Sequence, residues 1–432
     1  MGGQCEPIAV IGTGYVGLVT AAGFAQLGNE VWCVDIDADK IARLERGEVP
    51  IYERGLAECL EQNRERLHFS TELSAALEHA RLLFVAVGTP PTYSGDADLS
   101  AVNAVVAAMP QSDRHALVMK STVPVGTGAA IRRILAEQGK EGFAYVSCPE
   151  FLKEGSALPD FLEPDRVVVG DDGDWAGDAV VDLYAPLGAP LVRTDVASAE
   201  MIKLAANAFL ATKISFINEI ANVCEETGAD VVEVARGMGL DKRIGSSFLK
   251  PGLGFGGSCF PKDVSALKQL AGNSGYHFQL LTAVIEVNEL QKRRVVGKLQ
   301  KHLGSLVGKK VALLGLAFKP HTDDMREASS LVLAARLQAD GANVSAYDPV
   351  AEGEARKLMV GVQFAGGALE ALGDADACVI VTEWPEFTEL DWRQAAEQMA
   401  GTLVVDGRNC LDPVAVRAAG LTYEGVGRAG GP

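Results

Sequence analysis

The chain has 432 residues, of which 48% are hydrophobic and 22% are charged. It is longer than one hydrophobic core usually spans, so we expect two or three globular domains, and the composition is not that of a disordered protein. The formal net charge of −18 argues against binding to a nucleic-acid backbone, which requires a basic surface.

The cysteines and the apolar runs indicate in which compartment the protein lies and whether it binds a metal. No apolar run reaches the length that spans a bilayer, and the N-terminus lacks a basic stretch followed by a long apolar one. The 8 cysteines form no Cys-x-x-Cys pair and match no histidine spacing. We therefore expect a cytosolic protein with no membrane contact, no bound metal and no disulfide framework.

The first strand and helix patterns enclose a glycine motif. A strand over 8–11 ends in Gly12-Thr-Gly-Tyr-Val-Gly17, a helical pattern covers 18–27, and a second strand over 31–34 ends at Asp35. In this context the glycines indicate a dinucleotide pyrophosphate at a helix N-terminus, and the acid indicates ribose hydroxyls and therefore NAD rather than NADP. The less favoured reading is a glycine turn without a ligand. The predicted cofactor contacts in the motif are its glycines, Gly12, Gly14 and Gly17.

Three further strand patterns, over 82–87, 116–120 and 143–147, each end in a polar or glycine-bearing loop. In a doubly wound sheet these carboxyl ends line the ligand crevice, so the polar side chains there should face cofactor or substrate. For any single one, a capping or turn role is about as plausible. The side chains in question are Thr89, Thr122, Glu150 and Glu154.

A long helical pattern over 197–226 follows, and further helical stretches continue to residue 300. Lys203 and Asn207 are four residues apart and begin an otherwise apolar face. They mark either the end where the helix reaches solvent or side chains that project into a site, and we favour the site. A long apolar helix between two α/β domains also makes a dimer plausible.

Cys259 lies at the end of a glycine-rich loop and directly before a helical pattern that is predicted to stop at Gly272. A helix N-terminus favours thiolate over thiol, so this cysteine is a candidate nucleophile. The alternative is a small buried hydrophobe with glycines that only turn the chain. The loop alone weights the two interpretations about evenly.

The last third repeats the α/β alternation of the first without Gly-x-Gly-x-x-Gly, which predicts a second Rossmann-like domain that holds a different ligand. Lys319, Arg326 and Arg408 follow its strands and suit phosphate groups, although each singly is more often a solvated charge. The predicted fold is α/β, with two Rossmann-like doubly wound domains joined by a long central helical segment. The predicted domains are an NAD-binding domain over 1–196, a central helical and dimerisation domain with the cysteine loop over 197–301, and a second Rossmann-like domain for a different ligand over 302–432.

Taken in order, these motifs resemble those of the UDP-glucose/GDP-mannose dehydrogenase family along essentially the whole chain. The resemblance rests on the glycine fingerprint, Ser121-Thr-Val-Pro-Val-Gly126, Pro149-Glu-Phe-Leu-Lys-Glu-Gly155, the Lys203/Asn207 helix, Gly254-Phe-Gly-Gly-Ser-Cys-Phe-Pro-Lys-Asp263 and Ala317-Phe-Lys-Pro-His-Thr-Asp-Asp-Met-Arg326. It implies oxidation of the C6 alcohol of a nucleotide sugar to a carboxylate, with two hydrides passed to NAD. A cysteine thiohemiacetal and a thioester are the implied intermediates.

The resemblance also implies residue roles. Cys259 would be the nucleophile, Lys203 and Asn207 would stabilise the oxyanion, and Glu150, Asp263 and Thr122 would activate or order water. Arg243 would come from a neighbouring subunit. The implied NAD contacts, besides the motif glycines, are Tyr15, Val16, Asp35, Lys40, Thr89, Thr122, Glu154, Lys262 and Arg326. The implied substrate contacts are Glu150, Phe151, Leu152, Lys153, Lys203, Asn207, Arg243, Phe248, Leu249, Lys250, Pro251, Gly252, Gly256, Lys319 and Arg408.

Several alternatives stay open at this point. UDP-glucose is the favoured substrate and GDP-mannose is the alternative. The motifs do not decide between them, because the preference for uracil or guanine depends on contacts in the binding pocket. A two-electron hydroxyacid dehydrogenase would share the first domain but would have no use for Cys259. A non-catalytic NAD-binding protein is the least favoured interpretation, because Cys259, Lys203, Asn207 and Asp263 are all present.

Overall fold

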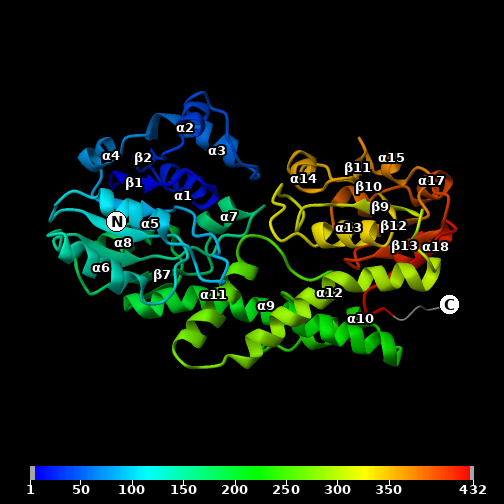
Figure 1. Ribbon diagram of the computed structural model, residues 1–432. Helices are drawn as coiled ribbons and strands as arrows, with labels where there is room; N and C mark the ends of the chain where they lie inside the picture. The colour runs from blue at the N-terminus through cyan, green and yellow to red at the C-terminus, as the bar shows by residue number, and fades with distance from the viewer. Residues whose placement is uncertain (1–4, 429–432) are drawn as a thin grey trace. The chain divides into compact units, whose positions relative to one another are not determined.

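The computed structural model describes residues 5–428 and divides into two compact units. The first comprises the chain through Ala206 together with Gln269–Gly275, and the second comprises Asn207–Lys268 and the chain from Tyr276 onward. Each unit contains one sheet, and a 32-residue helix joins the two along the chain (Figure 1). The predicted three-part division stays a prediction. Between residues 5 and 428, no helix is both long and apolar enough to cross a membrane.

The first unit contains an eight-stranded sheet in the order β3-β2-β1-β4-β5-β6-β7-β8. Pairing is parallel throughout except between β6 and β7, which meet antiparallel at Ser147 and Gly170. Its strands are β1 (Ile8–Ile11), β2 (Val31–Val34), β3 (Leu67–Ser70), β4 (Leu82–Val85), β5 (Ala116–Met119), β6 (Ala144–Ser147), β7 (Val167–Gly170) and β8 (Leu191–Thr194). Its helices are α1 (Tyr15–Gln26), α2 (Ala38–Glu45), α3 (Leu56–Gln62), α4 (Leu73–His79), α5 (Ser100–Ala108), α6 (Thr127–Glu137), α7 (Ala157–Leu162) and α8 (Trp175–Tyr184).

Strand β1 shows why this sheet is buried on both faces. All four of its residues are buried, and alternate side chains enter two different hydrophobic clusters, Ile8 and Val10 on one face and Ala9 and Ile11 on the other. A continuous apolar run of this kind is typical of a parallel strand covered by helices on both sides. The strand order and the covered faces confirm the predicted doubly wound fold for this unit.

Four helices form the central segment: α9 (Val196–Thr227), α10 (Val231–Gly239), α11 (Phe260–Asn273) and α12 (Gln279–Leu303). The long helix was predicted over 197–226 and is observed one residue longer at each end. The predicted stop of α11 at Gly272 is wrong, because Gly272 is helical and the left-handed conformation that ends the helix occurs at Gly275, with φ of 82°.

The second unit contains a six-stranded, fully parallel sheet in the order β11-β10-β9-β12-β13-β14, which confirms the second Rossmann-like domain. Its strands are β9 (Lys310–Leu314), β10 (Asn343–Tyr347), β11 (Gln363–Phe364), β12 (Ala377–Ile380), β13 (Leu403–Asp406) and β14 (Thr422–Gly425). Its helices are α13 (Ser329–Ala339), α14 (Glu352–Leu358), α15 (Ala368–Leu372), α16 (Pro385–Thr388), α17 (Trp392–Gln398) and α18 (Pro413–Ala418).

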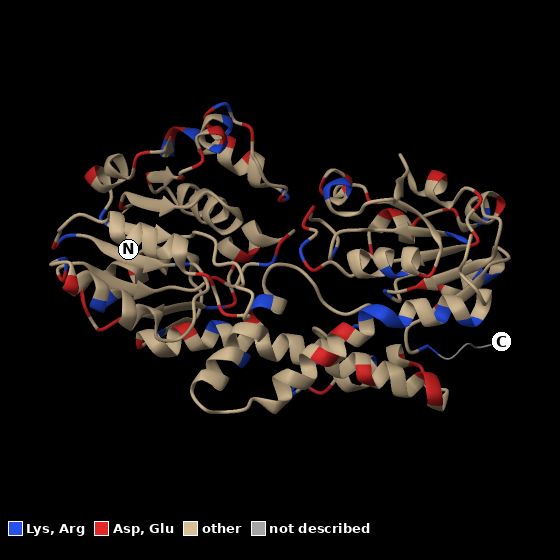
Figure 2. Cartoon of the chain, in the orientation of Figure 1, with Lys and Arg blue, Asp and Glu red and all other residues tan. Residues whose placement is uncertain are grey.

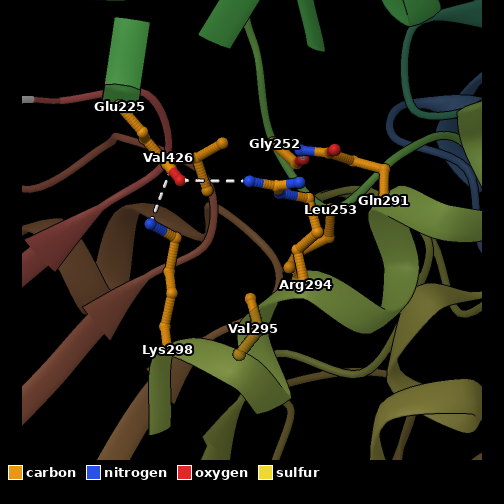
Figure 3. Close-up of a pocket in the computed structure, with 8 residues that line it drawn as sticks. All are labelled: Glu225, Gly252, Leu253, Gln291, Arg294, Val295, Lys298 and Val426. Atoms are coloured by element: carbon orange, nitrogen blue, oxygen red, sulfur yellow. Dashed lines mark hydrogen bonds and ion pairs between the residues drawn. The ribbon is translucent and has the colours of Figure 1, made fainter. Parts of the chain in front are cut away.

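Helix α12 is basic in its second half (Figure 2), and one of its cations, Lys298, contacts both α9 and the last strand of the second sheet. Lys298 Nζ lies 2.6 Å from Glu225, and Arg294 lies 3.4 Å from Glu225 (Figure 3). Lys298 Nζ also lies 3.2 Å from Glu424. Glu225 also accepts a 2.8 Å hydrogen bond from the Gly427 N–H. Lys298, Glu225 and Glu424 are largely buried, so each depends on its partners for compensation, whereas the Arg294 side chain is 41% exposed.

Replacing Lys298 with Met should destabilise the second unit by about 3 kcal/mol at pH 7, because two buried carboxylates lose their shared ammonium. Burial raises the pKa of the Glu225 and Glu424 carboxyls, but the neighbouring cations outweigh burial and hold both pKa values below normal. The stability they contribute is therefore present above the unfolded pKa of about 4.3 and is lost as pH falls through the lower folded values.

The control is Lys301→Met, since Lys301 also approaches Glu424 but its side chain is 68% exposed. It should cost less than about 1 kcal/mol. Denaturant unfolding at pH 7 and at about pH 3 measures both variants. A deficit for Lys298→Met that persists undiminished at the lower pH, or that Lys301→Met reproduces, contradicts the assignment.

Candidate active site

The turn between β1 and α1 leaves one glycine open for a ligand. Gly12 has φ of +96°, and a Cβ there would lie 2.8 Å from the Ala86 carbonyl oxygen. A Cβ on Gly17 would lie 1.8 Å from the Gly12 oxygen, so that glycine is required for packing of the turn. Nothing lies within 4 Å of a Cβ on Gly14, which directly precedes α1. A pyrophosphate therefore has open access to the helix N-terminus at this point.

Asp35 follows β2 and is held in place as an ionised acceptor. Its Oδ2 accepts from the Thr13 N–H at 2.8 Å and the Thr13 hydroxyl at 2.7 Å, and lies 2.9 Å from Lys40 Nζ. Burial alone would raise the pKa of this carboxyl, but the hydrogen bonds from Thr13 and Lys40 outweigh burial and lower it. The predicted cofactor residues Asp35 and Lys40 are thus brought together.

Glu53 joins the glycine motif to the loop after β6, and the sequence analysis missed it. Its carboxylate accepts a hydrogen bond from the Tyr15 hydroxyl, and it accepts from the Gly155 N–H at 2.6 Å and the Ala157 N–H at 2.9 Å. Burial raises the pKa of Tyr15, and Glu53 raises it further, so the hydroxyl stays a donor. The predicted contacts Tyr15 and Glu154 therefore belong to one connected region. No local motif marks Glu53, because its partners are about 40 and 100 residues away.

The loops after β4, β5 and β6 contain the other predicted polar residues of this unit. The Thr89 hydroxyl donates to the Thr122 carbonyl oxygen at 2.8 Å. Glu150 Oε2 accepts from the Leu152 N–H at 2.5 Å, and its Oε1 lies 3.0 Å from Lys203 Nζ. Both side chains of this ion pair are at least 94% buried. The Lys203 side chain is therefore buried, and its partner Glu150 is one of the two carboxylates, with Asp263, that are predicted to activate water. That Lys203 projects into a site stays a prediction.

A cavity of about 110 Å³ lies beside Glu150 and is lined by Phe151, Leu152 and Lys153 among others. Lys153 is turned toward Asp160, 3.1 Å away, and the Phe151 ring lies 5.3 Å from Lys203 Nζ. Lys120 also lines this cavity and was not predicted. The segment 150–153 thus borders a hollow in the first unit, which is the placement expected for ligand contacts.

Cys259 lies directly before the first residue of α11, as predicted, and its carbonyl oxygen accepts from the Asp263 N–H at 2.8 Å. Asp263 is 1% exposed and makes two close contacts. Its Oδ1 lies 2.6 Å from Lys262 Nζ, and its Oδ2 accepts from Asn207 Nδ2 at 2.6 Å. The second unit thus gathers the thiol, an acid, an amide and a cation within one turn of α11 and the facing part of α9.

The loop before Cys259 has a mixed composition of buried and exposed groups. Phe248 has a left-handed φ of 64°, and its ring packs edge-on to Phe260 at 6.0 Å. Leu249 is 3% exposed and packs in a hydrophobic cluster with α9. Lys250 is exposed and Pro251 is buried. The Leu249 side chain therefore packs in the core, and a substrate contact at Leu249 stays a prediction for its backbone.

The remaining predicted residues are arginines and a lysine of the second unit. Arg243 is 89% exposed and pairs with Asp241 at 2.6 Å. Arg326 lies 2.7 Å from Asp324, and Lys319 Nζ lies 5.3 Å from the Phe318 ring. Arg408 is more enclosed than Arg243 and Arg326, and its Nε donates to the Val381 carbonyl oxygen at 2.6 Å.

Comparison with known proteins identifies the family. Residues 6–188, 197–290 and 312–413 match the NAD binding, central and UDP binding domains of the UDP-glucose/GDP-mannose dehydrogenase family. The chain belongs to this family. Consistent with the NAD binding domain and with curated relatives along its full length, it is an NAD-dependent dehydrogenase.

The relatives cover nearly the whole chain. The UDP-glucose 6-dehydrogenase TuaD of Bacillus subtilis is 47% identical over 430 residues, which are 98% of this chain and 93% of TuaD. A UDP-glucose 6-dehydrogenase of Pseudomonas aeruginosa is 47% identical over 98% of this chain and 97% of its own. The structure of a UDP-glucose dehydrogenase from Pyrobaculum islandicum superposes with a TM-score of 0.92 at 40% identity, covering 99% of both chains.

The first unit of this dehydrogenase fits NAD on two observations, the open backbone at Gly14 and the ionised Asp35. Replacing Asp35 with Ala should weaken NAD binding about tenfold to a hundredfold, because a charge-assisted acceptor for the ribose hydroxyls is lost. The change also releases Lys40, so the preference for NAD over NADP should narrow. Titration with each dinucleotide measures this.

Asp37→Ala serves as the matched control, because Asp37 is an exposed carboxylate two residues away that only caps α2. It should leave both affinities within about twofold, since an N-cap contributes chiefly to helix stability. Equal losses in the two variants would remove Asp35 from the cofactor site.

Proposed function

We propose that the protein oxidises UDP-glucose at C6 to UDP-glucuronate. The observation that supports this most is the thiol of Cys259 at the N-terminus of α11, with Asp263 and Asn207 beside it. The curated relatives named above act as UDP-glucose 6-dehydrogenases. The net reaction consumes the alcohol, two NAD and one water, and yields the carboxylate, two NADH and three protons.

Bound NAD would accept a hydride in each of the two oxidations. Between them, the Cys259 thiolate adds to the C6 aldehyde and forms a tetrahedral thiohemiacetal, which retains the carbon covalently. Lys203 would donate to the oxyanion that develops, and Asn207 would be a second donor. After the second oxidation, water attacks the thioester carbonyl, the C–S bond breaks and the thiolate is released.

Two carboxylates are candidates to take the proton from that water, and Thr122 is proposed to order it. Glu150 is paired with Lys203, and Asp263 is paired with Lys262. Both carboxylates are held in place by these contacts, and a positioned carboxylate can accept a proton from water. The cytosolic location expected from the sequence is part of the same proposal, as are the remaining substrate and cofactor contacts named above.

The stoichiometry of the reaction tests the proposal. With excess NAD, about two NADH should form per UDP-glucose consumed. Cys259→Ala should abolish this yield, because no thiolate can then add to the aldehyde. Cys224→Ala is the control, since Cys224 is buried on α9 and burial raises its pKa. A ratio of about one in every variant would mean a single oxidation without a thiol. Turnover of GDP-mannose but not UDP-glucose would favour the alternative substrate.

We also propose that two copies of the chain associate along α9. Phe209, Phe216 and Val223 recur every seven residues and are 66%, 48% and 57% exposed. A seven-residue apolar repeat on a long helix is typical of a seam between helices, and the same stripe on a second copy offers the complementary surface. Arg243 is exposed on the following segment, which suits its proposed role in a neighbouring subunit.

Replacing Phe216 with Glu should convert the dimer to a monomer, because it places a charge in the middle of the seam. Val414→Glu introduces the same charge at an isolated apolar residue that is 72% exposed, and it should leave association intact. Sedimentation of both variants over a range of concentrations gives the answer. A monomeric natural chain, or a dimer that survives Phe216→Glu, refutes the seam.

A further inference from the structure

Amide side chains of α12 and α9 form hydrogen bonds with the backbone of the loop that precedes Cys259. Asn288 Oδ1 accepts from the Phe255 N–H at 2.7 Å, and its Nδ2 donates to the Phe255 carbonyl oxygen at 3.0 Å. Both backbone groups of one loop residue are thus paired with one side chain, in the way that a neighbouring strand would pair them. Asn288 is 3% exposed, so water does not compete for these bonds.

A second loop residue is held in the same manner by two amides. Gln291 lies one helical turn after Asn288 and donates to the Gly252 carbonyl oxygen at 2.9 Å (Figure 3). Asn218 of α9 accepts from the Gly252 N–H at 2.8 Å. The buried Asn218 Nδ2 finds no acceptor among the residues that the structure describes. Its amide is therefore oriented for the loop at the expense of its own second group.

The glycines of the loop make this grip possible. Gly254 has φ of +86°, and a Cβ there would lie 2.6 Å from Asn288 Oδ1. A Cβ on Gly256 would lie 2.2 Å from the Glu327 carbonyl oxygen, and the Gly257 N–H donates to the Arg326 carbonyl oxygen at 2.8 Å. The amides hold one side of the loop, and the backbone at 326–327 holds the other.

We propose that Asn288, Gln291 and Asn218 are positioning residues for the Cys259 thiol. The inference rests on the proposed function, in which that thiol attacks C6. Asn288 holds the backbone of Phe255, and the Cys259 carbonyl begins the hydrogen bonding of α11, so only residues 256–258 separate the amide-held backbone from the nucleophile. A shift of the amide-held backbone would therefore also displace the thiol, because so few residues lie between them. Small displacements of a nucleophile reduce reaction rates strongly.

The test compares Asn288→Ala with a matched control. Asn63→Ala removes a buried amide that also makes two good hydrogen bonds, to the Cys59 carbonyl oxygen at 2.9 Å and to Gln26 at 2.8 Å, in a part of the first unit without proposed site residues. Three quantities are measured for each variant at a temperature where it is folded: kcat and KM for UDP-glucose, NAD affinity, and the rate of Cys259 alkylation by iodoacetamide, read from the mass of its peptide.

For Asn288→Ala we expect kcat/KM for UDP-glucose to fall about 10²-fold, with the alkylation rate of Cys259 changed about tenfold and NAD affinity unchanged. For Asn63→Ala we expect stability to fall while the alkylation rate and kcat/KM stay close to those of the natural chain. Natural alkylation and turnover in Asn288→Ala, or the same losses in Asn63→Ala, would overturn the proposal. If Asn288→Ala does not fold, Gln291→Ala is judged by the same criteria.

The alkylation rate separates this inference from the proposed function. If the natural chain reduces no NAD with UDP-glucose, the proposed function fails on that measurement alone. The positioning of Cys259 is then still decided by whether Asn288→Ala changes its alkylation rate and Asn63→Ala does not.

Discussion

The buried ion pair between Lys203 and Glu150 is the constraint on which the first unit's candidate site depends. Neither charge is tolerable in this interior without the other, because removing one partner of a buried pair leaves an uncompensated charge and costs about 3–5 kcal/mol. The pair therefore fixes the start of α9 against the loop after β6. That loop also contains Phe151 and Glu154, so one electrostatic contact sets the register of a helix and of the predicted ligand contacts together.

The six strands of the second sheet repeat the order of the first six strands of the first sheet, but the two sheets differ at the acid that follows their second strand. Asp35 keeps one side turned toward the glycine motif and is stabilised by Thr13 and Lys40. Its counterpart after β10, Asp348, accepts at Oδ2 from the N–H groups of Leu316 and Ala317 and from the Trp384 indole. Asp348 is 2% exposed and has no capacity left for a ribose. The second sheet thus retains the fold but closes the feature that recognises a dinucleotide, which agrees with the prediction of a different ligand there.

The sequence pattern predicted those structural features that depend on residues close together in the chain. The strands over 8–11 and 31–34 were placed to the residue, and so was the position of Cys259 before α11, since apolar runs and helix starts depend on neighbours in sequence. The antiparallel contact of β7 and the end of α11 at Asn273, two residues before the left-handed Gly275, were not predicted. Glycine pattern alone does not tell a helical glycine from a left-handed one, because packing after the helix decides the difference.

Residues that act on distant backbone were missed for a related reason. Glu53 and Asn288 bind segments 102 and 33 residues away, and nothing in their own surroundings marks them as acceptors or donors for those segments. One signal was available for Asn288 and Gln291. Both are polar residues on the inward face of α12, and a buried amide on an apolar face requires a partner. That reasoning was applied to Lys203 and Asn207 and was not extended to α12.

The two glycine-rich motifs illustrate how the same residue answers different physical demands. In the dinucleotide turn, Gly14 faces open space, and a ligand can use the absence of its side chain. In the cysteine loop, the space beside Gly254 and Gly256 is filled by Asn288 and by the Glu327 carbonyl of the protein itself. A sequence reading treats both runs as places where backbone meets a ligand. In the structure the two motifs differ. The first leaves space for a cofactor, and the second leaves space for the side-chain and backbone groups of the protein that hold the loop. In the cysteine loop, glycine therefore serves chemistry indirectly, by letting neighbouring groups approach closely enough to fix the backbone that bears the thiol.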